Sequence, residues 1–540
     1  MGVVNTRKNK MAPCQEACPA GIDVPRYIRT IREGRFEEAL AVIRERIPFP
    51  FVCGYACVHP CEAKCSRNQF EGPVAIRMLK RIAAEKGWKK QPRPVSMSPT
   101  GRKVAVIGSG PAGLTAAYYL TLQGHDVTVF EALAEAGGML RYGIPGYRLP
   151  DEIVDRDIKV IEDCGVKIRT KKRIDSAEAL LDKGFEAVFV ASGAWRGLKM
   201  GIAGEDGPGV LDGLTFLKAV NSDKAPRIGN RVIVVGGGNT AIDAARASRR
   251  LGADVTILYR RTRAEMPAAA AEIEEALEEG VTIEFLTAPV RIEKGAVTCI
   301  RMALGQPDAS GRPRPVPVKG SDYVMEATTV IMAVGQEVEV PAATLKRNKN
   351  GTIAVNADSL ATSAKGIFAG GDAATGPASI IAAIGQGRKA SVAIDRFLGG
   401  TGVIDRLTDN TALTDPPEAS PRGTFRAAAR AASPKKRLGD FEIVEKVYDP
   451  ATAMQEAARC LSCDLREFDV TVNEAACKDC GYCREVCGLE IFERSDRFNP
   501  GGYRPTVAAQ AERCIGCLKC LYICPDFAIT IRDRRDRIEK

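Results

Sequence analysis

The pattern of hydrophobic and polar positions divides the chain into stretches of different character. In residues 1–95 the pattern predicts short helices, such as 24–33 and 35–46, separated by loops that carry cysteines. From Arg102 the pattern changes to an apolar strand, a glycine-rich turn and a helix, KVAVIGSGPAGLTAAYYL, followed by the strand HDVTVFE. RVIVVGGGNTAIDAARAS and ADVTILYRR repeat this plan. The order strand, turn, helix, strand is typical of a parallel α/β sheet, so we expect two Rossmann-like domains.

Length and composition agree with a multidomain globular protein. The chain has 540 residues, which is too long for one hydrophobic core. Of these residues 45% are hydrophobic and 27% are charged, as in ordinary globular proteins. Residues 413–439 have the Pro, Ser and Lys content of a linker. We expect an N-terminal α-helical domain at 1–95, a dinucleotide-binding domain split over 101–225 and 346–400, a second one inserted at 226–345, a linker at 401–466 and an α+β domain at 467–540.

Charge and hydropathy exclude several classes of protein. The net charge is +10, but the 77 basic and 67 acidic residues are interspersed, and no nucleic-acid-binding motif accompanies them, so we expect no nucleic-acid partner. No apolar run reaches the length of about 18 residues that indicates a membrane span. The N-terminal sequence MGVVNTRKNK also lacks the apolar core of a signal peptide. We therefore expect a cytoplasmic protein.

Cysteine placement points to metal chemistry. The chain has 18 cysteines and only 2 histidines, which leaves little room for histidine-based catalysis. Only Cys164 and Cys299 stand apart from the clusters. In a long chain without an export signal, clustered cysteines favour iron–sulfur or metal ligation over disulfides. The clustered cysteines, four sets of four, are Cys14, Cys18, Cys53, Cys57, Cys61, Cys65, Cys460, Cys463, Cys477, Cys480, Cys483, Cys487, Cys514, Cys517, Cys520 and Cys524.

The first glycine-rich turn has the context of a dinucleotide site. Gly108, Gly110 and Gly113 form GxGxxG between the strand VAVI and a helix. Small residues let the backbone approach a pyrophosphate, and the helix N-terminus presents N–H groups to it. Glu131 follows the next strand, 18 residues after Gly113, where a carboxylate can bind ribose hydroxyls.

The second turn differs where the ribose of the nucleotide is expected. Its fingerprint GxGxxA comprises Gly236, Gly238 and Ala241 and includes Asn239. In place of an acid, this unit has Tyr259, and Arg260 and Arg261 follow it. Guanidinium groups can bind a 2′-phosphate bidentately, which favours NADPH over NADH. The same residues also fit a plain solvated strand end, so NADP and NAD both stay open.

The last ten cysteines include two runs typical of bacterial ferredoxins with two clusters. Both runs follow C-x2-C-x2-C-x3-C, and in such proteins the fourth cysteine of each run ligates the other cluster. Zinc knuckles are the alternative, but these usually pair two CxxC hooks per ion. We assign one 4Fe-4S cluster to Cys477, Cys480, Cys483 and Cys524 and the other to Cys514, Cys517, Cys520 and Cys487.

These motifs make the chain similar to flavoprotein oxidoreductases with two dinucleotide domains. In that group the first fingerprint binds FAD and the second binds NAD(P), and an aspartate of a later GD motif bonds the ribityl chain. The segment KGIFAGGDAA supplies Gly371 and Asp372 for this role. GGMLRYGIP, which contains Gly138, is similar to the loop near the isoalloxazine ring. The CxxC or CxxxxC pair of the disulfide reductases is absent from the flavin segment, which disfavours thiol–disulfide chemistry.

The cysteine pattern narrows the resemblance to the glutamate synthase small-subunit family and to the N-terminal half of dihydropyrimidine dehydrogenase. It covers about residues 10–465 and includes YRRTRAEMPA and GIFAGGDAA. In that family a CxxC pair precedes the other N-terminal cysteines, whereas RCLSC stands on the C-terminal side here. The resemblance implies that Cys460 and Cys463 fold back to complete the cluster begun at Cys14 and Cys18. Free thiols at Cys460 and Cys463 are the alternative.

Ligand pairing among the eight thiols outside the two ferredoxin-like runs stays open. In dihydropyrimidine dehydrogenase one ligand is a glutamine, and that position aligns near Lys80. Since lysine is a poor iron–sulfur ligand, we expect Cys53 to serve instead.

The C-terminal part resembles the ferredoxin-like delta subunits of 2-oxoacid oxidoreductases, with NPGGYRP and CPDFAIT. The combination implies an FAD-dependent NAD(P)H oxidoreductase with four 4Fe-4S clusters, in which hydride transfer needs no catalytic acid or base of the protein. It implies an electron-transfer subunit of a hetero-oligomeric complex whose partner is a ferredoxin or a catalytic subunit such as a 2-oxoacid oxidoreductase. The small subunit of a glutamate synthase and a noncatalytic iron–sulfur scaffold are the alternatives. Electron direction, bifurcation and stoichiometry stay open.

Overall fold

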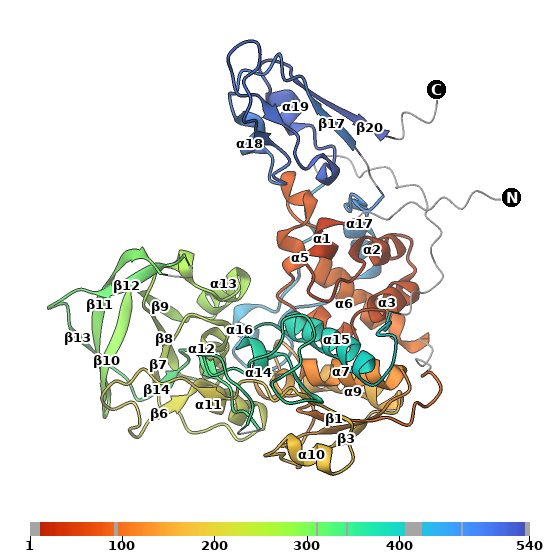
Figure 1. Ribbon diagram of the computed structural model, residues 1–540. Helices are drawn as coiled ribbons and strands as arrows, with labels where there is room; N and C mark the ends of the chain where they lie inside the picture. Colours follow the sequence, from red (N-terminus) through yellow and green to blue (C-terminus); the bar gives the residue numbers. More distant parts are fainter. Residues whose placement is uncertain are drawn as a thin grey trace.

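The computed structural model describes residues 11–90, 96–308, 311–341, 344–405, 424–465 and 468–534. An N-terminal helical domain lies between a C-terminal module and the first dinucleotide-binding domain, and the second dinucleotide-binding domain projects to one side (Figure 1). Of the predicted linker at 401–466, residues 406–423 and 466 lie outside the described ranges. None of the described helices is long and apolar enough to cross a membrane.

The N-terminal domain is held together by close helix crossings. A Cβ atom on Gly54 would lie 2.6 Å from the Arg81 Cα atom, and one on Gly87 would lie 2.5 Å from the Phe36 carbonyl oxygen. Glycine at both positions therefore lets the helix of residues 76–87 pack against the backbone of the helices at 50–56 and 36–44. The helices are α1 (Pro13–Glu16), α2 (Val24–Arg32), α3 (Phe36–Arg44), α4 (Pro50–Ala56), α5 (Pro60–Ala63) and α6 (Ile76–Gly87), with the 3-10 turns η1 (Ser66–Gln69) and η2 (Trp88–Lys90).

The first parallel sheet has the order β16-β4-β1-β2-β3. Its strands are β1 (Lys103–Ile107), β2 (Asp126–Phe130), β3 (Lys167–Arg169), β4 (Ala187–Val190) and β16 (Ile367–Ala369). Helices α7 (Pro111–Leu122) and α15 (Ile380–Phe397) cross closely, since a Cβ atom on Gly387 would lie 2.4 Å from the Ala112 carbonyl oxygen. Because β16 joins this sheet only after the whole second sheet, the second domain is inserted into the first.

The second parallel sheet has the order β6-β14-β7-β8-β9. Its strands are β6 (Val210–Asp212), β7 (Arg231–Val235), β8 (Asp254–Tyr259), β9 (Thr282–Phe285) and β14 (Thr329–Met332), with helices α11 (Gly213–Asn221), α12 (Asn239–Arg250) and α13 (Ala270–Glu278). Since β6 pairs with β14, this sheet begins before residue 226, where the sequence analysis places the start of the domain.

An antiparallel ribbon extends from the second sheet at the left edge of Figure 1. It consists of β10 (Thr287–Glu293), β11 (Ala296–Pro307), β12 (Pro313–Pro317) and β13 (Tyr323–Glu326). The remaining short elements are α8 (Met139–Tyr142), α9 (Asp151–Asp163), α10 (Glu178–Asp182), α14 (Asp372–Thr375), β5 (Arg196–Gly197), β15 (Gln336–Glu337) and η3 (Arg263–Glu265).

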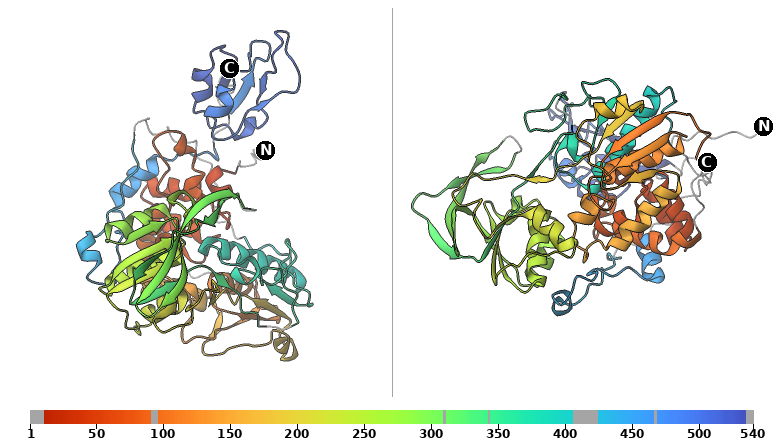
Figure 2. Two further views of the ribbon diagram at one scale, coloured as in Figure 1. Left: turned by 90° about the vertical axis from the view of Figure 1, so that its left-hand side faces the viewer. Right: turned by 90° about the horizontal axis from the view of Figure 1, so that it is seen from below.

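The C-terminal module stands apart from the dinucleotide domains, as the left view of Figure 2 shows. Its outer strands β17 (Phe468–Val472) and β20 (Ile529–Asp533) are antiparallel, so the two ends of the module meet. The other elements are α18 (Tyr482–Val486), α19 (Lys519–Ile523), β18 (Glu493–Arg494), β19 (Thr506–Val507) and η4 (Ala511–Arg513).

Residues 424–465, the return segment, run back to the N-terminal domain and contain α16 (Pro434–Arg437) and α17 (Pro450–Ala458). The buried Glu456 carboxylate accepts hydrogen bonds from the backbone of Ala75 and of Ala427, both at 2.8 Å. Arg459 also pairs with Glu456 at 2.7 Å. A buried acid therefore helps to fix in place a segment that includes part of the predicted linker.

Asp157 on α9 joins the first dinucleotide domain to the N-terminal domain. Its Oδ2 atom accepts a hydrogen bond from the Val52 backbone N–H at 2.9 Å, and burial raises the pKa of Asp157 to about 7. The unfolded value is about 4, so the native state holds this proton more tightly than the unfolded state does. The stability that Asp157 contributes is therefore complete below about pH 4 and is lost as the pH rises through about 7.

We expect Asp157→Asn to raise the unfolding temperature at pH 8 and to leave it unchanged near pH 4. Each kcal/mol added to the free energy of unfolding should raise the unfolding temperature by about 2–4 °C. Calorimetry across this pH range checks the result, with Asp163→Asn, at an exposed position of the same helix, as the control. An Asp157→Asn protein that is less stable than the wild type at pH 8 would contradict the argument.

Candidate functional site

Both glycine-rich turns open into a single cavity of about 1110 Å³. The turn between β1 and α7 contributes Gly108 and Gly110, and the turn between β7 and α12 contributes Gly236 and Gly238. The cavity thus lies at the carboxyl ends of both parallel sheets, where open α/β sheets bind their ligands. None of the described residues that line it is a cysteine.

The first turn requires glycine where the backbone packs closely. Gly108 has a φ of +101°, and a Cβ atom there would lie 2.4 Å from the Ala191 carbonyl oxygen. A Cβ atom on Gly113 would lie 2.0 Å from the Gly108 carbonyl oxygen. Gly110 is different, because a Cβ atom there meets nothing within 4 Å. Gly110 therefore adjoins open space in the cavity, where a pyrophosphate can approach.

The acids predicted near the first turn also line the cavity. Glu131 is 5% exposed, and its carboxylate accepts hydrogen bonds from the backbone N–H groups of Ser109 at 3.0 Å and Leu133 at 2.7 Å. Asp372 accepts one from Ala378 at 3.2 Å, and burial raises its pKa to about 6. Asp372 begins the short helix α14 directly after Gly371.

Two further glycines press against the first turn. A Cβ atom on Gly138 would lie 2.9 Å from the Gly110 Cα atom, and one on Gly371 would lie 2.8 Å from the Ala112 Cβ atom. Both have positive φ, +57° and +61°. The structure therefore brings every residue predicted for FAD, except the packed Gly113, to the wall of one cavity. These side chains and backbone amides fit a dinucleotide.

The second turn places the two predicted arginines differently. Arg261 is 4% exposed, and its guanidinium donates to the Pro313 carbonyl at 2.8 Å and pairs with Asp308 at 2.9 Å. It therefore holds the ribbon against β8. Arg260 is exposed at the cavity, and Arg312 of the ribbon lines the same cavity. Sequence reasoning missed Arg312, because the only signal was its place in the basic run GRPRP.

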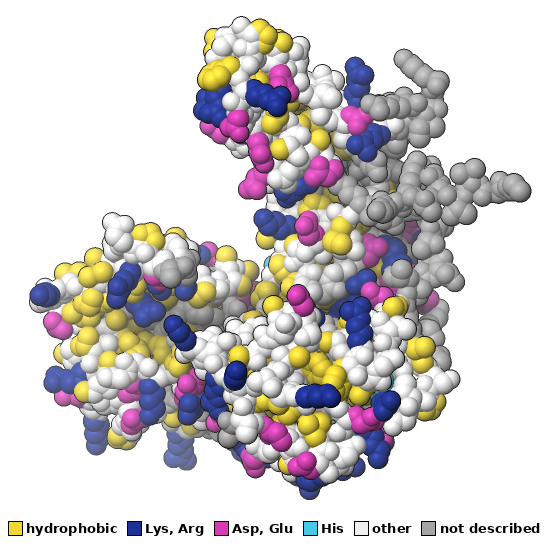
Figure 3. Space-filling model, in the orientation of Figure 1, with side chains coloured by type: hydrophobic (Ala, Val, Ile, Leu, Met, Phe, Trp, Pro, Cys, Tyr) yellow, Lys and Arg dark blue, Asp and Glu magenta, His cyan; other side chains and the backbone are white. Residues whose placement is uncertain are grey.

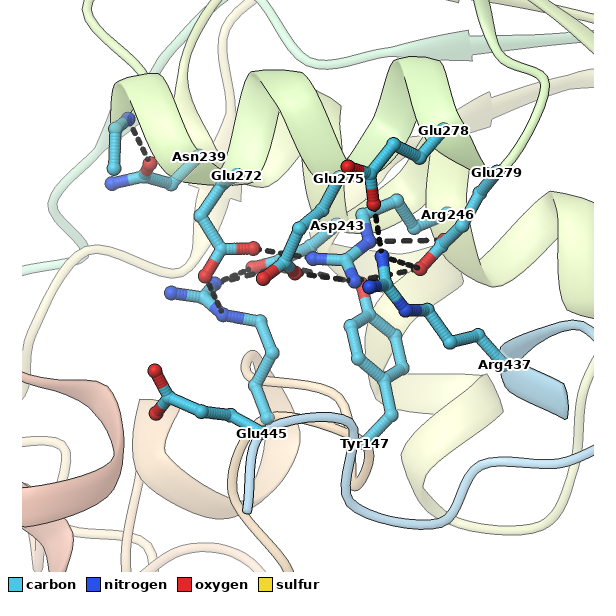
Figure 4. Close-up of polar contacts among 12 residues, drawn as sticks. Tyr147, Asn239, Asp243, Arg246, Glu272, Glu275, Glu278, Glu279, Arg437 and Glu445 are labelled. Carbon is cyan, nitrogen blue, oxygen red and sulfur yellow. Dashed lines mark hydrogen bonds and ion pairs between the residues drawn. The ribbon is translucent and has the colours of Figure 1, made fainter. Parts of the chain in front are cut away.

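Asn239 and Gly236 shape the second turn itself. The Asn239 side chain accepts a hydrogen bond from the Ala269 backbone N–H at 3.1 Å, which ties the start of α12 to the start of α13 (Figure 4). Gly236 has a φ of +145°, and a Cβ atom there would lie 2.2 Å from the Ala333 carbonyl oxygen. Gly238 meets nothing within 4 Å and so matches Gly110 of the first turn.

A charged network fixes the second domain against the first and against the return segment (Figure 4). Arg148, which lines the cavity, pairs with Asp243 at 2.6 Å and with Glu272 at 3.0 Å. The fully buried Arg246 pairs with Glu279 at 2.7 Å. Further members are Tyr147, Glu275, Glu278 and Arg437. Elsewhere on the face drawn in Figure 3, basic and acidic side chains are interspersed.

Four thiols from both ends of the chain line one small cavity, and we call them the bridging thiols: Cys14, Cys65, Cys460 and Cys463. The Cys463 thiol lies 3.4 Å from the Ser66 hydroxyl. Burial is the largest cause of the raised pKa of Cys14, and the neighbouring thiols Cys460, Cys463 and Cys65 raise it further. The returning pair thus meets Cys14, and the fourth thiol in this cavity is Cys65, whereas the family resemblance implies Cys18.

We call a second set of four the inner thiols, which are the thiols whose charges act on the pKa of Lys80: Cys18, Cys53, Cys57 and Cys61. The Cys53 thiol donates to Cys57 and, together with the charge of Lys80, lowers the pKa of Cys57 to about 6. Burial lowers the pKa of Lys80, but the nearby thiolates outweigh it and raise the pKa above its usual value. A thiolate is the form that binds iron.

The C-terminal thiols also fall into two sets. Cys487, Cys514, Cys517 and Cys520 line one small cavity. In the other set Cys477 accepts a hydrogen bond from the Thr506 N–H at 3.4 Å, and Cys524 accepts one from Ala528 at 3.3 Å. Cys480 of this set is exposed.

Backbone N–H donors to cysteine sulfur are typical of iron–sulfur sites, where they help to set the reduction potential. Cys57 and Cys514 also accept such bonds, from His59 and Gly516, both at 3.4 Å. The four-thiol sets and these donors fit 4Fe-4S clusters. Within the described ranges, no group of three or more His, Cys, Asp or Glu side chains is placed to hold a single metal ion.

Gln69 connects the N-terminal domain to the C-terminal module. It lines the cavity of Cys487 and Cys514, and a Cβ atom on Gly488 would lie 2.2 Å from the Gln69 Nε2 atom. Gln69 ends the turn η1, which begins directly after Cys65 of the bridging thiols. One short turn therefore separates the bridging thiols from the module.

Three family models match the chain. They are pyridine nucleotide-disulphide oxidoreductase at residues 102–387, the 4Fe-4S domain II of dihydropyrimidine dehydrogenase at 7–92, and a 4Fe-4S dicluster domain at 469–536. The chain is 41% identical to the NADP(+)-dependent formate dehydrogenase subunit beta of Moorella thermoacetica, over 84% of this chain and 70% of that protein.

Two further relatives are similar to large parts of the chain. The NADPH-Fe(3+) oxidoreductase subunit beta of Geobacter sulfurreducens is 41% identical over 84% of this chain and 75% of its own length. The glutamate synthase [NADPH] small chain of Escherichia coli is 34% identical over 71% of this chain and 88% of its own length.

Proposed function

Because the chain belongs to the pyridine nucleotide-disulphide oxidoreductase family, we propose that it is the NADPH-linked electron-transfer subunit of a larger oxidoreductase. The family models confirm the predicted resemblance, the fold class and the cofactor classes FAD, NAD(P) and 4Fe-4S. The protein is an FAD-dependent NAD(P)H oxidoreductase with iron–sulfur domains at both ends. When bound, FAD would supply the conversion between the two electrons of one hydride and the single electrons that iron–sulfur clusters take.

The observation that carries the proposal is the position of Cys57. Its neighbours Ala56 and Val58 line the dinucleotide cavity, so this part of the N-terminal domain closes one wall of it. The inner thiols therefore adjoin the flavin site, and the bridging thiols adjoin the inner thiols through Cys61 and Cys14. Gln69 then leads to the C-terminal module. This order supports a single route from nicotinamide to the module.

The outer end of this route supports a partner protein. Cys480 is exposed, and Tyr522 and Phe527 of the same module are 75% and 87% exposed. The two relatives that are 41% identical are both named as beta subunits, which supports a separate catalytic subunit as the partner. We propose that the partner docks at this end in the cytoplasm. The glutamate synthase alternative has weaker support, since that relative is 34% identical over 71% of the chain.

Anaerobic addition of NADPH to the purified full chain tests the proposal. We expect loss of the visible flavin absorbance, followed by the electron paramagnetic resonance signals of reduced clusters. NADH should act more weakly. If the flavin stays oxidised with both nucleotides, the proposed enzyme activity is wrong and the noncatalytic iron–sulfur scaffold is favoured.

The preference for NADPH should depend on Arg260. A hydrogen bond to a charged group is worth about 1.5–3 kcal/mol, so Arg260→Ala should raise the KM for NADPH about ten- to hundredfold. The KM for NADH should stay unchanged, because NADH carries no 2′-phosphate. Steady-state kinetics with both nucleotides checks this, with Arg263→Ala as the control, since Arg263 is paired with Glu274 and does not line the cavity. Equal changes for both nucleotides would show that Arg260 does not read the 2′-phosphate.

A further inference from the structure

Lys80 is a buried cation in an unusual setting. It is 3% exposed on α6, and in the part of the chain that the structure describes it forms no ion pair with a carboxylate. The ionisable groups that act on its charge are the four inner thiols. A buried ammonium without an anionic partner costs several kcal/mol. Cysteines that bind a cluster as thiolates would supply the counter-charge at this position.

The backbone fixes Lys80 in this place. Gly54 follows Cys53, and its contact with Arg81, which follows Lys80, presses α4 against α6. One turn before Lys80, Arg77 donates to the carbonyl oxygens of Gly54 at 3.1 Å and Tyr55 at 3.0 Å. The Arg81 guanidinium lies 3.8 Å from the centre of the Tyr55 ring. The helix turn that carries Lys80 is therefore bound on both sides to the helix that carries Cys53.

The bridging thiols have a different electrostatic environment. The buried cation in their cavity wall is Arg67, which pairs with Glu71 at 2.9 Å. Arg67 is thus paired with a carboxylate, whereas Lys80 has no carboxylate partner among the described residues. The two neighbouring sets differ in net charge, although both consist of four cysteines.

We propose that Lys80 tunes the redox level of the inner thiols: its ammonium raises the reduction potential of a 4Fe-4S cluster held by Cys18, Cys53, Cys57 and Cys61. One-electron reduction makes such a cluster one charge more negative, and a nearby fixed positive charge stabilises the reduced state. An ammonium has three donors and no lone pair, so Lys80 acts through charge and not as a ligand. The proposal rests on the proposed function, because it makes the set beside the flavin cavity the first acceptor.

The test measures each cluster potential in the full holoprotein by a dithionite titration followed by electron paramagnetic resonance. The chemical reductant makes the result independent of whether NADPH reduces the protein. In Lys80→Met we expect one cluster to shift to a more negative potential while iron content stays the same. Lys80→Arg should keep the wild-type potential. Lys86→Met, at an exposed position of the same helix, is the matched control and should shift nothing.

Two results would overturn the proposal. One is an unchanged or more positive potential in Lys80→Met with full iron content. The other is a loss of about four iron atoms per chain in Lys80→Met while Cys53→Ser keeps all its iron, since Lys80 would then take the place of a ligand. If Lys80→Met does not assemble, Lys80→Gln, which keeps an N–H donor but not the charge, gives the same measurement.

Discussion

The double variant Cys460→Ser, Cys463→Ser should lose about one quarter of the iron, about four atoms per chain, and keep its full FAD content. The reason is the make-up of the bridging thiols, of which these two cysteines are half. The flavin cavity lies elsewhere and contains no bridging thiol among its described lining residues, so FAD binding is unaffected. Iron and flavin assays on the anaerobically purified protein measure both quantities.

In the double variant, electron flow from NADPH should stop at the bridging thiols. NADPH should still bleach the flavin of the double variant, but the clusters of the C-terminal module should stay oxidised, because the route passes through the bridging thiols before Gln69. Cys164→Ser is the control, since Cys164 lies outside all four sets. Unchanged iron in the double variant would mean that Cys460 and Cys463 are free thiols.

Equivalent substitutions in the two glycine turns should separate the two dinucleotide sites. Gly110 and Gly238 both stand directly before a helix in extended backbone, with φ, ψ of −72°, −179° and −90°, 176°, which valine adopts without strain. Added side chains meet no protein atom within 4 Å at the Cβ position and so fill ligand space only. Each variant should therefore fold and lose one nucleotide.

We expect Gly110→Val to lower FAD content by about tenfold or more, equal to a loss of about 1.4 kcal/mol in binding free energy. Gly238→Val should keep FAD but lose reduction by NADPH, while dithionite still reduces its clusters. Each variant is the control of the other. FAD loss in Gly238→Val with retention in Gly110→Val would reverse the assignment of the two sites.

Local signals in the sequence account for both parallel sheets and both glycine turns. Buried strands such as β1 and β7 are continuous apolar runs, and each is followed by glycines and a helix. The ribbon from β10 to β13 has no such signal, because its strands are largely exposed and carry Pro313, Pro315 and Pro317. Its existence follows from tertiary contacts, such as that of Arg261 with Asp308, which no local pattern encodes.

The grouping of the N-terminal cysteines was equally out of reach. Spacing predicts that Cys61 and Cys65 belong to iron–sulfur sites, but these neighbours divide between the inner and the bridging thiols. The division depends on how α4, α6 and the return segment cross, and therefore on contacts such as that of Gly54 with Arg81. In the same way, Arg260 and Arg261 are identical in sequence terms, and only burial distinguishes their roles.

The bridging thiols impose an order on biosynthesis. Cys463 contacts Ser66 across 397 positions of sequence, and the whole flavoprotein lies between them. A ribosome therefore has to make both dinucleotide domains before the last two ligands of this site exist. During that time the site contains only Cys14 and Cys65 of its four thiols. A cluster held by all four bridging thiols would therefore be completed only after the chain has been synthesised as far as Cys463 and the return segment has folded back.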